Sequence, residues 1–134
     1  MAGYSGTPLP KKLGIKPGHR VAVLGAPPGF ALDVPEADVV SSLRGKQALD
    51  VVVLFTKKRA TLDAKFDAIR ARMSDACGFW VAWPKKSSGV ATDLNEDLIR
   101  VFALASGLVD NKVCAIDDTW SGLRLVIRLR DRGK

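Results

Sequence analysis

The amino-acid sequence predicts a three-layer α/β sandwich built on a mostly parallel sheet of five strands, with an antiparallel closing strand. Short apolar runs alternate with amphipathic stretches along most of the chain, and this alternation is typical of parallel sheets covered by helices. The final run, Leu123–Arg130, instead alternates apolar and basic side chains, which indicates a strand with one exposed face. At 134 residues the chain has the length of one domain, in which residues 1–19 form an N-terminal arm.

Five apolar runs are the predicted strands. Arg20–Leu24, Asp50–Phe55 and Gly78–Trp83 are bounded by turn residues and have the composition of strands buried on both faces. The proline that follows the third run should end it, because proline cannot donate a hydrogen bond to a ladder. Lys112–Ile116 and Leu123–Arg130 close the sheet, and the arginines of the last run would keep an outer strand from aggregating edge to edge.

Amphipathic stretches between the strands are predicted helices. Pro35–Leu43 begins with a proline, which suits the first position of a helix. Arg59–Met73 carries one apolar stripe, and a third helix opens where Asp93 and Glu96 have the spacing of a capping box. Leu9–Gly14 predicts a single helical turn in the arm. Helices between successive parallel strands cover both faces of the sheet, which predicts a Rossmann-like architecture.

Composition argues against several classes of protein. No apolar run approaches the roughly 18 residues of a membrane span, and we expect no signal peptide. Cys77 and Cys114 are too few for a disulfide framework or a metal site, so we predict two reduced core thiols in a cytoplasmic protein without a metal. The only histidine, His19, precedes the first strand, far from the carboxyl ends of the strands. Catalysis there by a histidine-activated nucleophile or a histidine-bound zinc ion is therefore not expected.

The net charge of +7, from 21 basic and 14 acidic residues, raises the question of nucleic-acid binding. The basic residues are spread over the loops, one helix and the C-terminus. They form no stripe with aromatic residues of the kind that stacks bases. A solvated basic surface is the simpler interpretation, and nucleic acid is not an expected partner.

Candidate site residues follow the predicted strands. The carboxyl ends of parallel strands meet at one edge of a sheet, and open α/β sheets bind ligands at that edge. The loops at this edge supply polar, basic and small residues, and we take these as the candidate ligand-binding set: Gly25, Ala26, Gly29, Lys57, Lys58, Lys85, Lys86, Ser87, Ser88, Asp117, Asp118, Thr119 and Trp120.

Two of these loops have both a binding and a structural interpretation. The glycines of Gly25–Gly29 would let backbone N–H groups approach a phosphate or an adenosyl group, whereas its two prolines remove donors and favour a rigid turn. Lys85–Ser88, with Lys57 and Lys58, would bind a phosphate or a carboxylate near the positive end of a helix dipole. The alternative for these lysines is a solvated basic loop.

The turn before the last strand is also open to two interpretations. Asp117 and Asp118 would either accept backbone hydrogen bonds in a turn or serve as a base or a Mg²⁺ ligand. Trp120 would supply a flat apolar wall for a ring. The sequence does not choose between these roles, and it names no catalytic residue.

Five segments carry a resemblance that extends over nearly the whole chain. They are Tyr4–Ile15, Val23–Gly29, Trp83–Gly89, Thr92–Asn95 and Ala115–Ser121. Together they resemble a family of small bacterial proteins defined by a domain of unknown function. The resemblance implies a bacterial cytosolic protein and brings no activity with it.

The order of elements also resembles a shortened class I methyltransferase, a fold that binds S-adenosylmethionine. Residues 20–30 stand where that family has its glycine-rich first loop, residues 50–55 and 78–83 look like its fourth and fifth strands, and residues 112–129 look like its closing pair. The chain departs from the family at Leu24, where an acidic residue is usual. The second and third strands are expected to be missing between Phe30 and Asp50, together with the acidic residue that holds the ribose hydroxyls.

Three hypotheses follow from these observations. The first is a non-catalytic domain that binds an anionic small ligand or a protein partner at the carboxyl edge of its sheet. The second is a methyltransferase-like or nucleotide-binding enzyme with a reduced site, which would use Asp117 or Asp118 as a base. The third is nucleic-acid binding through a basic surface, which would weaken steeply with salt. The sequence identifies no cofactor, and it leaves open whether the last strand pairs across a homodimer.

Overall fold

A computed structural model of the chain describes residues 7–133. The first residues of the Tyr4–Ile15 segment therefore lie outside the described part. The strands are β1 Arg20–Leu24, β2 Asp38–Val40, β3 Leu49–Phe55, β4 Met73–Pro84, β5 Leu108–Ala115 and β6 Trp120–Ile127. The helices are α1 Leu9–Lys12, α2 Arg59–Arg72 and α3 Glu96–Ala105, with short 3-10 turns η1 Lys86–Ser88 and η2 Leu129–Asp131.

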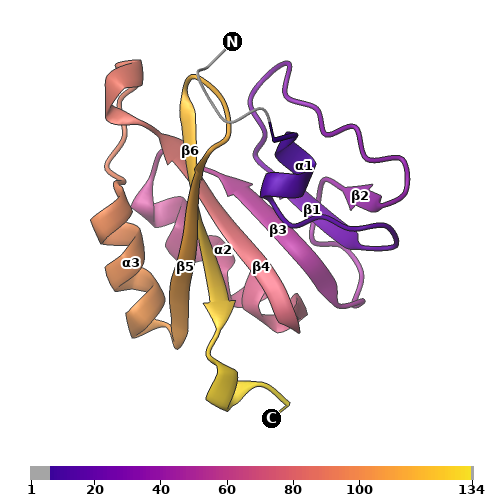
Figure 1. Cartoon of the computed structure of the whole chain (residues 1–134). Helices are drawn as coiled ribbons and strands as arrows, with labels where there is room; N and C mark the ends of the chain where they lie inside the picture. Colours follow the sequence, from indigo (N-terminus) through magenta and orange to yellow (C-terminus); the bar gives the residue numbers. More distant parts are fainter. Residues whose placement is uncertain (1–6, 134) are drawn as a thin grey trace.

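The strands form one mixed sheet in the order β2-β1-β3-β4-β6-β5 (Figure 1). Neighbouring strands from β2 to β4 pair in parallel, whereas β6 is antiparallel to both β4 and β5. The protein is thus an α/β Rossmann-like domain with a mostly parallel sheet, as the sequence predicts. The predicted number of five strands is wrong, because the described residues form six.

The extra strand replaces a predicted helix. Pro35–Leu43 contains β2, which pairs in parallel with the start of β1, and a backbone bond from Asp38 N–H to the His19 carbonyl (2.9 Å) leads into it. Val39 and Val40 explain the outcome, since β-branched side chains favour extended backbone over a helix. The resemblance to methyltransferases predicts that two strands are missing between Phe30 and Asp50. That prediction is wrong for one of them, because β2 lies in this interval.

The last strand lies inside the sheet, and the prediction that it is an edge strand is wrong. Strand β6 begins at Trp120, earlier than the predicted Leu123, and sits between β4 and β5. Among residues 7–133 the edges are formed by β2 and β5. Beyond Ile127 the chain leaves the sheet and turns through η2, where the Leu129 side chain is largely exposed. An apolar and basic alternation therefore marks an internal strand here, because a charged side chain can lie in a hollow on the sheet.

Two apolar layers cover the sheet. Helices α2 and α3 pack on one face, where Leu62 and Ile99 are fully buried against β3 and β4. The other face is covered by α1, seen in front of the sheet in Figure 1, and by the coil of residues 25–37. Leu13 from the arm is buried there, and its carbonyl accepts a hydrogen bond from the buried Trp80 Nε1 (3.0 Å). The second outer layer is therefore mostly coil, whereas the sequence predicts helices on both faces.

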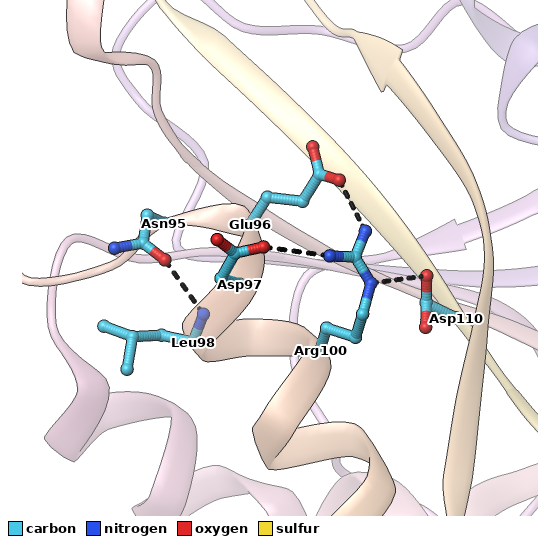
Figure 2. A network of polar contacts seen from close by, with 6 residues as sticks. All are labelled: Asn95, Glu96, Asp97, Leu98, Arg100 and Asp110. Atoms are coloured by element: carbon cyan, nitrogen blue, oxygen red, sulfur yellow. Dashed lines mark hydrogen bonds and ion pairs between the residues drawn. The ribbon is translucent and has the colours of Figure 1, made fainter.

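The third helix starts two residues later than the predicted capping box. Asn95 is its N-cap, and the side-chain oxygen of Asn95 accepts the Leu98 backbone N–H at 2.9 Å (Figure 2). Asp93 instead accepts the backbone N–H of Arg59, the first residue of α2, at 2.7 Å. The prediction that Asp93 caps its own helix is wrong, because its carboxylate satisfies a donor of the neighbouring helix.

Candidate functional site

The carboxyl ends of β1, β3 and β4 meet at one edge of the sheet, together with the turn between β5 and β6 (top of Figure 1). The register places Leu24 beside Leu54 and Phe55 beside Ala82. The loops that hold the candidate residues therefore begin side by side, which is the arrangement that the sequence predicts for this edge.

The Gly25–Gly29 loop passes directly over the end of β3. Gly25 has a φ of +67°, and a Cβ atom placed on it would lie 2.7 Å from the Phe55 carbonyl oxygen. Only glycine combines that backbone conformation with so close an approach. A turn closed by Phe30 N–H and the Pro27 carbonyl (3.1 Å) follows, and Ala26 and Gly29 are exposed. The loop thus forms a hydrogen-bonded turn, and its role in binding a ligand stays a prediction.

An aromatic series fills the middle of this edge. The Phe30 and Phe55 rings lie 4.8 Å apart between centroids, and the Phe55 and Trp120 rings lie 5.2 Å apart. Both pairs have the T-shaped geometry that aromatic rings favour, and Trp120 is only 7% exposed. Trp120 is therefore a core residue, and the interpretation of it as an open wall for a ligand ring is wrong.

Two hollows flank the segment Phe30–Ala31, which lines both of them. The first has a volume of about 240 Å³ and lies at the carboxyl ends of β1 and β2, between Val23, Val40 and Ser41. The second has a volume of about 360 Å³ and extends from the arm over the prolines of the loop to Asp117. Space for a ligand at this edge is thus divided in two by one aromatic residue and its neighbour.

The four candidate lysines stay apart from these hollows. Lys57, Lys58 and Lys86 are exposed and Lys85 is half-buried, and within residues 7–133 none of the four forms an ion pair. The hollow of about 490 Å³ beside this loop is lined by one of them, Lys86. The sequence therefore places the right loops at this edge, but the structure does not gather their ammonium groups in one hollow.

The serines beside these lysines have different surroundings. The Ser88 hydroxyl donates to the Lys85 carbonyl (2.7 Å) and accepts the Val90 N–H (3.2 Å), so it closes a turn. Ser87 is exposed. The backbone N–H of Lys85 donates to the Thr119 carbonyl at 2.8 Å, which joins the β4 loop to the β5–β6 turn.

Asp117 accepts backbone hydrogen bonds within the Asp117–Thr119 turn. Its Oδ1 atom accepts the backbone N–H groups of Thr119 and Trp120, both at 2.8 Å. Asp117 therefore has the structural role that carboxylates often take in turns, with its second oxygen left over. Asp118 is exposed at the tip of the turn, and no hydrogen bond within the described residues orients its side chain.

A group of opposite charges on α3 could be mistaken for a site. The Arg100 guanidinium binds the carboxylates of Glu96, Asp97 (3.0 Å) and Asp110 (3.1 Å), as Figure 2 shows. Hydrogen bonds to Glu96 and Asp110 raise the pKa of Arg100 above its ordinary value. These groups satisfy one another and join α3 to β5, so their role is structural.

The chemistry of the remaining reactive groups is limited. Both cysteines are free; burial, with a smaller effect of Asp50, raises the pKa of Cys77 to about 12, and burial also raises the pKa of Cys114. Residues 7–133 contain no group of three or more histidine, cysteine or acidic side chains placed to hold a metal ion. In the same part of the chain, no helix has the length and hydropathy that crossing a membrane requires.

Sequence reasoning missed a basic hollow away from the carboxyl edge. It has a volume of about 410 Å³, and Lys16, His19, Asp50, Lys112 and Arg124 contribute to its lining. These residues come from the arm and from three strands, so no local sequence motif predicts that they lie together. The sequence signal that could have found the hollow is Arg124, because a charged side chain on a mostly buried strand requires a polar space.

Proteins of the same Rossmann-like fold among the solved structures are described as methyltransferases. Three crystal structures share this fold with 12% sequence identity each. A TehB-like SAM-dependent methyltransferase from Corynebacterium glutamicum aligns with a TM-score of 0.58 over 95% of this chain and 91% of its own. Magnesium protoporphyrin IX methyltransferase from Synechocystis PCC 6803, solved with bound SAH, aligns with a TM-score of 0.56 over 84% of this chain and 75% of its own.

A protein assigned as a type 11 methyltransferase from Sulfolobus solfataricus aligns with a TM-score of 0.52 over 76% of this chain, which spans 64% of that protein. No protein-family model matches the chain, and no curated protein matches it. The resemblance to class I methyltransferases is thus confirmed at the level of the fold, and membership of the bacterial family stays a prediction.

Proposed function

We propose that this protein is a small methyltransferase-like domain that binds an adenosyl ligand, S-adenosylmethionine or S-adenosylhomocysteine, at the carboxyl ends of β1 and β2. The single observation that carries the proposal is the fold, which this chain shares with three structures described as methyltransferases, one of them with bound SAH. This favours the second of the sequence hypotheses over the non-catalytic first one.

The hollow between β1 and β2 suits the base of such a ligand. Val23, Leu32 and Val40 supply apolar walls, the Phe30 ring lies beside them, and Ser41 offers a hydroxyl. Its volume of about 240 Å³ is below the roughly 300–1,000 Å³ of complete ligand pockets, so it would hold only part of the ligand. The remainder would extend past Ala31 into the second hollow, where Asp117 has an oxygen available for an amino group.

The ribose hydroxyls of the ligand would find no carboxylate here. Leu24 ends β1, where an acidic residue is usual in the methyltransferase family, and the residues that follow β2 are Ser41 and Ser42 rather than carboxylates. A hydrogen bond to a charged acceptor contributes about 1.5–3 kcal/mol, so its absence should weaken binding by roughly tenfold to a hundredfold. We therefore expect an adenosyl ligand to bind in the high micromolar to millimolar range.

S-adenosylmethionine, when bound, supplies an activated methyl group, and the residues of this chain would hold and orient it. No base for an acceptor follows from the geometry, because Asp117 is engaged in its turn and the Asp118 side chain is exposed. The proposal is therefore one of ligand binding, and a methyltransferase assay is a separate experiment.

Calorimetric titration and thermal unfolding of the full chain with S-adenosylhomocysteine test the proposal. We expect saturable binding that Ala31→Trp abolishes, because Ala31 lines both hollows and is exposed, so that an indole blocks the space without disturbing the core. Ala68→Trp, an exposed substitution on α2, is the matched control and should bind as the parent does. No binding at millimolar ligand, or equal binding by both variants, would contradict the proposal.

A further inference from the structure

The basic hollow lies on the face of the sheet that the arm covers, toward the amino ends of the parallel strands. Asp50 is at the start of β3, His19 directly precedes β1, and Lys16 belongs to the arm. Lys112 and Arg124 face each other across β5 and β6 in the sheet register. The volume of about 410 Å³ lies within the range of small-molecule pockets.

Arg124 is the central residue of this hollow. Its guanidinium lies over Gly78 of β4, where an added Cβ would come within 2.5 Å of Arg124 Nε. Because Gly78 has no side chain, the guanidinium can occupy the space above it. Within residues 7–133 the Arg124 side chain has no hydrogen bond or ion pair, although it is half-buried, and burial lowers its pKa. A partly desolvated cation that forms no ion pair gains most from an anionic ligand.

The surrounding groups add positive charge and hydrogen-bond donors. Lys16 and Lys112 are exposed at the rim. His19 Nδ1 accepts the Lys16 backbone N–H at 3.1 Å, so the neutral imidazole carries its proton on Nε2, which is then a donor. The carboxylate in the lining belongs to Asp50, whose Oδ2 accepts the Arg20 backbone N–H at 2.8 Å and whose Oδ1 remains as an acceptor.

We propose that this hollow binds a small phosphorylated molecule that also carries hydroxyl groups. The guanidinium of Arg124 presents paired N–H donors that match two oxygens of a phosphate, and the ammonium groups of Lys16 and Lys112 neutralise its second charge. The Oδ1 atom of Asp50 accepts from a hydroxyl of the same ligand. A hollow lined from two sides, without aromatic side chains among its lining residues, suits a small molecule better than a nucleic-acid strand.

The test is calorimetric titration of the full chain with glucose 6-phosphate, inorganic phosphate and glucose at constant ionic strength. We expect saturable binding of glucose 6-phosphate, weaker binding of phosphate alone and none of glucose. Arg124→Gln should weaken glucose 6-phosphate binding by at least about tenfold, the usual effect of losing a hydrogen bond to a charged group. Arg130→Gln removes an exposed charge outside the hollow and should bind as the parent does.

Two further variants keep the test decisive if Arg124→Gln fails to fold. Gly78→Ala preserves every charge and displaces the guanidinium, and Lys112→Gln alters only the exposed rim, so both should weaken binding. The proposal is overturned if the parent shows no saturable binding of glucose 6-phosphate at millimolar concentration. It is also overturned if the hollow variants and Arg130→Gln bind equally, or if only an RNA oligonucleotide binds.

Discussion

At the scale of the residue, Gly25 determines how closely the first loop can lie on β3. Substitution by alanine combines a strained φ of +67° with a contact of 2.7 Å to the Phe55 carbonyl oxygen. Gly29 has a φ of +83° with no atom within 4 Å of an added Cβ, so Gly29→Ala isolates the backbone strain. We expect Gly29→Ala to lower the free energy of unfolding by about 1 kcal/mol and Gly25→Ala by about 2–4 kcal/mol, measured in urea. Equal losses in the two variants would show that the close approach is not a constraint.

A second prediction at this scale concerns Cys77 and the stability of the protein at alkaline pH. Its pKa is about 12 in the folded protein, against 9.0 for an ordinary thiol. Between these values the folded protein keeps a proton that the unfolded chain has lost, so the free energy of unfolding falls as the pH rises from 9 toward 12. The slope that Cys77 contributes is at most about 1.4 kcal/mol per pH unit. Urea unfolding at successive pH values should show a shallower decline for Cys77→Ala, whereas parallel declines would contradict the prediction.

At the scale of the element, the start of α3 depends on one side chain. Asn95→Ala removes the acceptor of the Leu98 N–H and should lower the free energy of unfolding by about 1 kcal/mol. Asn95→Asp keeps an acceptor at the same position, and its negative charge interacts favourably with the helix dipole. It should therefore leave the stability unchanged within a few tenths of a kcal/mol. Denaturant unfolding of the two variants decides the matter, and a loss in both would point to some other role of the amide.

The elements that were predicted correctly are those whose signals are local. Asp50–Phe55 is a buried strand because its own side chains are apolar and β-branched, and its neighbours need not be known. The strand at Asp38–Val40 was missed because three residues carry too little periodicity to compete with a proline that suits a helix start. Asp93 was misassigned because the donor that it satisfies, Arg59 N–H, belongs to another helix and is 34 positions away.

At the scale of the whole molecule, the two proposed sites lie at opposite ends of the sheet and share no lining residue. Ligands at sites without common partners stabilise a protein additively. We expect S-adenosylhomocysteine and glucose 6-phosphate together to raise the unfolding free energy by the sum of their separate effects. Thermal unfolding with each ligand and with both measures this, and competition between them would mean that they occupy one site.

The whole-molecule scale is also where prediction from the sequence reached its limit. The edge at which the strand ends converge follows from parallel pairing alone, and the loops there were identified correctly. The basic hollow depends on Gly78 leaving space for Arg124 and on the arm placing Lys16 above it, which are facts of packing between distant segments. The net charge shows that the chain has an excess of basic residues, but it does not show that several of them line one hollow.

The hydrogen bond from Trp80 to the Leu13 carbonyl has a practical consequence for following the arm in solution. The indole is fully buried, and its Nε1 donates to a carbonyl 67 positions earlier in the chain, so its emission depends on whether that segment stays docked. Release of the arm would expose the ring to water and shift its fluorescence to longer wavelength, even while β4 stays paired. The protein thereby contains an optical reporter of the arm, which fluorescence and quenching can read without any added label once Trp83 and Trp120 are replaced by phenylalanine.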